Sequence, residues 1–90
     1  MRKFMIEREI GGVGKLDSCA LSRAAGKSNE ALASLAPKVQ WQQSYVTADR
    51  TFCVYLAENE EVIREHAKRS GFPANRIIEI TGVIDPSTAA

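Results

Sequence analysis

Apolar and polar residues alternate along four stretches of the chain, and this two-residue period predicts β-strands. The stretches are residues 3–10, 38–47, 50–57 and 76–84. Only the turn at Ala48–Asp49 separates the second stretch from the third, so we expect these two strands to form a hairpin.

Two further stretches carry apolar residues at helical spacing. The first helix is expected over residues 16–36 and ends before Pro37, which cannot continue a helix. The second is expected to begin after Asn59, whose side chain suits the N-cap, and to run to about residue 70. Gly71 then stops it, because glycine readily adopts the left-handed backbone that ends helices.

The resulting order, β-α-β-β-α-β, predicts an α+β, ferredoxin-like domain spanning residues 1–90, with an irregular tail at 85–90. In this fold a four-stranded antiparallel sheet carries both helices on one face. From the alternation we expect the helix-facing side to hold these apolar residues: Phe4, Ile6, Val46, Phe52, Val54, Leu56, Ile78 and Ile80.

The opposite side of the sheet is then expected to be aromatic and polar at once. Its members would be Met5, Glu7, Glu9, Trp41, Gln43, Tyr45, Cys53, Tyr55, Ile77, Glu79 and Thr81. Such a mixed face is typical of an interface or a ligand site. Two copies packed sheet to sheet, as in the dimeric α+β barrel arrangement, would enclose it as a cavity.

Charge and composition exclude several classes of function. The chain has 12 basic and 11 acidic residues with no basic run, which argues against a nucleic-acid partner. We find neither a signal peptide nor an apolar stretch long enough to cross a membrane, which favours the cytoplasm. In that reducing compartment Cys19 and Cys53, which lack CxxC spacing, are expected to be free thiols.

Several short motifs are spread over most of the chain. They are Trp41, Ser44–Thr47, Phe52–Tyr55, Glu60–Glu61, Arg64–Ala67, Gly71–Ile77 and Asp85–Ala89. In these residues the chain resembles a family of small bacterial proteins of unknown function in which one described member binds nickel. The resemblance implies a homodimer of ferredoxin-like domains and nickel as a candidate cofactor.

Two residues are candidates for metal or nucleophilic chemistry. His66 is the first, because a neutral imidazole is a usual ligand of nickel and of other late first-row metals. The alternative is a half-buried histidine with one hydrogen bond, since a lone histidine lacks the spacing of strong metal motifs. Cys53 would be a thiolate ligand, a reactive nucleophile or simply a small buried apolar residue.

Carboxylates and aromatic residues complete the expected ligand site. Glu7 and Glu79 would line the cavity as metal ligands or as acid and base, or would pair with arginines at its rim. An aromatic wall would serve packing or ligand stacking. The expected ligand-binding set is therefore Glu7, Trp41, Tyr45, Cys53, Tyr55 and Glu79, with His66 as the metal ligand.

Three functions fit these observations. We favour a small homodimeric protein that binds a metal ion or small ligand and has no catalytic role. The alternative is a cofactor-independent enzyme of the dimeric α+β barrel type, resembling monooxygenases or isomerases, which would need a base with a shifted pKa in the cavity. A purely structural module would instead fill the cavity with side chains. The motif at Asp85–Thr88 is expected to cross to a partner subunit or to cover the cavity mouth.

Overall fold

The structure, a computed structural model, describes residues 1–89 and has the expected α+β architecture. Two short 3-10 helices, η1 and η2, follow the first and last strands. Strand β4 is shorter than the alternation suggested. The elements are β1 (Arg2–Glu9), η1 (Val13–Lys15), α1 (Ser18–Leu35), β2 (Val39–Val46), β3 (Arg50–Ala57), α2 (Glu60–Ser70), β4 (Arg76–Ile80) and η2 (Pro86–Ala89).

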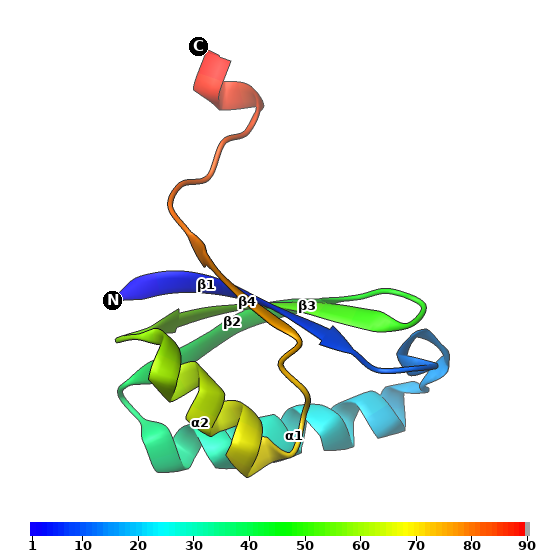
Figure 1. The fold of residues 1–90 in the computed structure, drawn as a ribbon. Coiled ribbons are helices and arrows are strands. Elements are labelled where there is room, and N and C mark those ends of the chain that lie inside the picture. The colour runs from blue at the N-terminus through cyan, green and yellow to red at the C-terminus, as the bar shows by residue number, and fades with distance from the viewer. Residues whose placement is uncertain (90) are drawn as a thin grey trace.

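The four strands form one antiparallel sheet in the order β2-β3-β1-β4, and both helices cover the same face of it (Figure 1). Strand β1 is central and pairs with both β3 and β4. This is the ferredoxin-like βαββαβ topology that the order of elements predicts. We refer to the sheet side without helices as the open face.

Local side-chain chemistry sets the helix ends. The carboxylate of Asp17 accepts a hydrogen bond from the backbone N–H of Ala20 at 2.8 Å, and Asn59 accepts one from Val62 at 3.0 Å. Gly71 ends α2 with a left-handed φ of 78°. Neither helix of residues 1–89 has the length and apolar character needed to cross a membrane.

The pairing register reverses the expected faces of strand β3. Tyr55 lies opposite Phe4 and Cys53 opposite Ile6, so both lie on the helix-facing side. Phe52, Val54 and Leu56 therefore lie on the open face. The alternation could not decide this, because both residue sets of β3 are largely apolar and only the pairing with β1 tells them apart.

Trp41 changes face for a different reason. A β-bulge between Trp41 and Gln43 inserts one extra residue into β2. Trp41 consequently lies opposite Tyr55 on the helix-facing side, whereas Tyr45 lies opposite Phe52 on the open face. Simple alternation had placed the two aromatic residues together.

The remaining corrections concern the edge strands. The pairing with β1 reverses the expected faces of β4 as well. Ile77 lies opposite Ile6 and Glu79 opposite Phe4 on the helix-facing side, whereas Ile78 and Ile80 lie opposite Met5 and Lys3 on the open face. Val46 lies opposite Thr51, on the helix-facing side as expected. The core between sheet and helices is built from Phe4, Ile6, Val39, Cys53, Tyr55, Ala57 and Ile63, with Leu32, Leu35, Trp41, Val62, Ala74 and Ile77 packed against it.

The last described residues, 81–89, form a tail that runs away from the body of the molecule. It leaves the end of β4 on the side of the sheet opposite the helices (Figure 1). Val83 and Ile84 are 72% and 84% exposed along it. The segment expected to be irregular contains η2, where Asp85 accepts a hydrogen bond from the N–H of Ser87 at 2.8 Å.

Candidate functional site

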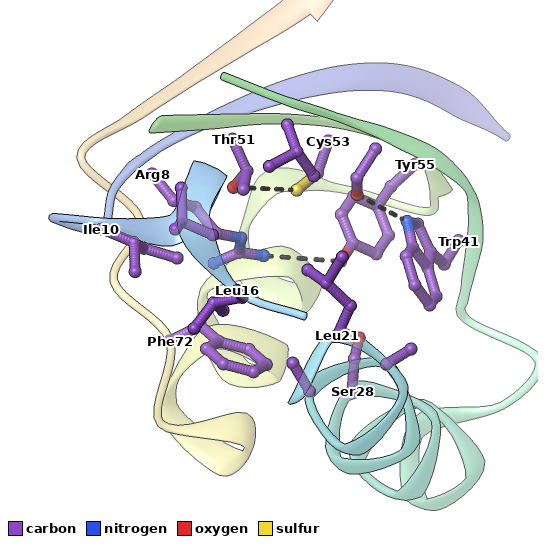
Figure 2. A pocket seen from close by; sticks show the side chains of 15 residues that line it. Arg8, Ile10, Leu16, Leu21, Ser28, Trp41, Thr51, Cys53, Tyr55 and Phe72 are labelled. Atoms are coloured by element: carbon purple, nitrogen blue, oxygen red, sulfur yellow. Dashed lines mark hydrogen bonds between the residues drawn. The ribbon is translucent and has the colours of Figure 1, made fainter. Parts of the chain in front are cut away.

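A pocket of about 310 Å³ lies between α1 and the helix-facing side of the sheet, and we call it the α1 pocket. Figure 2 shows the side chains that line it. Most of the lining is apolar side chain. The lining residues are Arg8, Ile10, Val13, Leu16, Leu21, Ala24, Ala25, Ser28, Trp41, Ser44, Val46, Thr51, Cys53, Tyr55 and Phe72.

Arg8 forms the charged end of the α1 pocket. It is 2% exposed, although it is the last residue but one of β1. Its Nη1 donates to the carbonyl oxygen of Pro73 at 2.6 Å, and its Nη2 lies 3.5 Å from the hydroxyl of Tyr55. None of the ion pairs among residues 1–89 includes Arg8.

The other polar groups of the pocket are neutral and have partners. The Nε1 of Trp41 donates to Ser44 Oγ at 3.0 Å, and the Sγ of Cys53 donates to Thr51 Oγ1 at 3.6 Å. Burial raises the pKa of the Tyr55 hydroxyl above its ordinary value of 10.0, and the Arg8 charge offsets this in part. Tyr55 therefore keeps its proton at neutral pH.

His66, on α2, lies between the helices and the sheet and contacts the pocket residues Ser28 and Tyr55. It has no exposed surface, and its Nε2 is 3.1 Å from Ser28 Oγ. Its ring centre is 5.2 Å from that of Tyr55. Burial, followed by the nearby Arg8 charge, lowers the pKa of His66 below 6.5, so the imidazole is neutral at pH 7. Its Nδ1 has no hydrogen-bond partner within the described chain.

The surroundings of His66 do not fit a nickel ion. Within residues 1–89, no group of three or more His, Cys, Asp or Glu side chains is arranged to hold a metal. The charge that acts on the imidazole is the positive charge of Arg8, which disfavours a second cation beside it. Within the described chain, His66 is fully buried and its Nε2 lies within hydrogen-bond distance of the Ser28 hydroxyl.

The structure separates the residues that were expected to form one site. Trp41, Cys53 and Tyr55 line the α1 pocket. Glu7 and Tyr45 lie on the open face.

Glu79 lies opposite Phe4, so it belongs to the helix-facing set of β4 and not to the open face. Both carboxylates are engaged in ion pairs. Glu7 pairs with Arg50, which also contacts Glu9 at 3.1 Å. Glu79 forms a two-pronged pair with Arg2, with bonds of 2.6 and 3.2 Å, away from the pocket lining. Both carboxylates therefore pair with arginines, and neither lines the α1 pocket.

Sequence reasoning missed Arg8 as a site residue. A signal was present, because the two-residue period that puts Phe4 and Ile6 on the helix-facing side puts Arg8 there too. A charged residue at an inward position of a strand is unusual enough to indicate a function.

The sequence and the fold both have recognisable relatives. Residues 4–80 match the family model described as nickel responsive protein SCO4226-like. The structure is similar to the crystal structure of SCO4226 from Streptomyces coelicolor A3(2), with a TM-score of 0.75 and 18% identity. The match covers 91% of this chain and 99% of that one, and at this identity it shows a shared fold. Among curated proteins, none matches the sequence.

Proposed function

The chain belongs to the SCO4226-like family of nickel responsive proteins, and we propose that it is a small binding protein that holds an organic ligand in the α1 pocket. One observation carries the proposal. A 90-residue protein leaves about 310 Å³ unfilled beside its core, a volume within the range of small-molecule sites. Protein interiors are normally close-packed, so an apolar ligand would restore contacts that the lining lacks.

Binding without catalysis is favoured by the groups that face the pocket. Its titratable lining residues are Arg8, Cys53 and Tyr55. A general base needs a pKa near the working pH, whereas the pKa of Tyr55 is raised above 10.0. The lining therefore supports holding a ligand better than moving its protons.

A second copy of the chain is the proposed partner on the open face. Met5, Phe52, Val54, Leu56 and Ile78 lie on that face, where Met5 is opposite both Val54 and Ile78, and Figure 1 shows no helix over it. Apolar faces of this kind are typical of interfaces. The tail leaves the body on that same side, which supports an arm that packs against the second copy.

The proposed function does not include nickel binding, because no group of three or more His, Cys, Asp or Glu side chains among the described residues could hold the ion. Calorimetric titration with nickel tests this directly. We expect no binding that depends on His66. Nickel binding that is present in the wild type and lost in His66→Ala would return His66 to the role of a metal ligand.

The pocket itself is tested with a neutral flat probe, 2-naphthamide, by calorimetry and by amide chemical shifts. We expect binding with shifts centred on Trp41, Thr51 and Cys53, which line the pocket. Ala25→Phe places a ring in the pocket and should abolish binding. The control is Ala33→Phe, on the exposed side of the same helix, which should leave binding unchanged. No binding in the wild type, or equal binding in both variants, contradicts the proposal.

A further inference from the structure

Among the buried polar residues of the described chain, Arg8 is the one whose side chain is charged at pH 7. It is almost fully buried, and no carboxylate of residues 1–89 pairs with it. Burying a charge without a counter-ion is costly, and buried charges in proteins are normally paired. An arrangement of this kind is stabilised when an anion enters beside it.

Two contacts hold the guanidinium group in place. The short bond from Nη1 to the Pro73 carbonyl oxygen fixes one end, and the Tyr55 hydroxyl lies beside Nη2. Figure 2 shows the group extending into the pocket toward Tyr55, with Leu16 and Phe72 on its other side. These contacts leave further N–H groups of the planar fork free of protein partners in the described chain.

The groups around Arg8 supply no negative charge. Tyr55 and His66 are both neutral at pH 7, since burial raises the pKa of the first and lowers that of the second. Of the described residues that line the pocket, Arg8 alone is charged. The site therefore carries a single positive charge in apolar surroundings.

We propose that the α1 pocket selects a monocarboxylate with a flat apolar body, whose carboxylate pairs with Arg8 while the body lies against the apolar wall between Trp41 and Leu21. This inference rests on the proposed function and names its ligand class. A carboxylate matches the guanidinium fork in shape. A phosphate monoester carries nearly two charges at neutral pH, for which a single arginine is a poor match.

The test compares two probes of the same shape, 2-naphthoate and 2-naphthamide, which differ in charge. A hydrogen-bonded charged pair favours the naphthoate by about 10- to 100-fold in dissociation constant in the wild type. Arg8→Met keeps most of the side-chain volume and removes the charge. It should bind both probes with equal affinity. The control, Arg64→Met, changes an exposed arginine on α2 and should keep the preference.

Arg8→Lys provides a second variant in case the methionine variant fails to fold. It keeps the charge and loses the fork, so a reduced preference for naphthoate is expected. Equal binding of the two probes to the wild type overturns the carboxylate proposal and leaves the pocket in place. The same holds if both Arg8 variants retain the full preference. Failure of both probes to bind overturns the pocket itself, so the two proposals fail in different ways.

Discussion

Replacing the two exposed apolar residues of the tail should weaken the proposed dimer. Val83 and Ile84 are 72% and 84% exposed in a single chain, although the residues on either side of them are small or polar. In the double variant Val83→Ser/Ile84→Ser the tail keeps its length and loses its apolar surface. The change lies outside the sheet and the helices, so the fold of each subunit should be unaffected.

The size of the effect follows from the exposed surface. Full burial of a Val or Ile side chain contributes about 1.5–3 kcal/mol. Since most of Val83 and Ile84 is exposed, covering both on a second copy contributes about 2–4 kcal/mol for each tail. A symmetric dimer has two such tails, which gives about 4–8 kcal/mol. Even the lower value raises the dissociation constant of the dimer by roughly a thousandfold.

Sedimentation velocity over a dilution series measures this constant. The wild type should remain dimeric at concentrations where the double variant is monomeric. Ala89→Ser, a change in the same tail that removes little apolar surface, is the control and should match the wild type. An unchanged dimer constant in the double variant would refute the role of the tail. A monomeric wild type would refute the dimer as well.

Three further outcomes are expected in urea denaturation. Stability should be insensitive to His66 well above pH 6.5 and should fall as the pH drops through this value. The reason is that the unfolded chain binds the proton first, because the pKa of His66 is lowered in the folded protein. His66→Gln should therefore flatten the profile between pH 7.5 and 5.5, and an identical slope contradicts this. Gly14→Ala would place a Cβ 2.7 Å from a backbone oxygen of the β2–β3 turn and should lower the free energy of unfolding by about 1–3 kcal/mol. Gly11→Ala, which has open space around it, should lower it much less, and equal losses in the two variants would contradict the clash. Asn59→Ala should remove the N-cap of α2 and lower the free energy of unfolding by about 1 kcal/mol. The control is Asn29→Ala, at an exposed position within α1, which should show no such loss.

The order of elements was predictable because its signals act locally. The N-cap at Asn59, the glycine at 71 and the short hairpin turn each involve neighbours within a few residues. Such contacts form in the same way wherever the segment lies in the fold. The family resemblance and the α+β topology followed from the same residues and are confirmed.

The site was less predictable because it depends on which side of the sheet each strand presents. Strand β3 offers Phe52 and Val54 to one side and Cys53 and Tyr55 to the other, and both sets suit a core. The bulge before Gln43 then separates Trp41 from Tyr45. A shift of one residue in register exchanges the two faces of a strand, so the expected cavity on the open face was assigned several residues that line the α1 pocket instead.

The amino-acid sequence by itself determined the strands, the helices, their order and the inward position of Arg8, because periodicity and capping are properties of short segments. Only the tertiary structure decided which aromatic residues meet Arg8. That outcome depends on pairing between strands that are far apart in the chain, where long-range contacts choose between two faces of similar hydrophobicity.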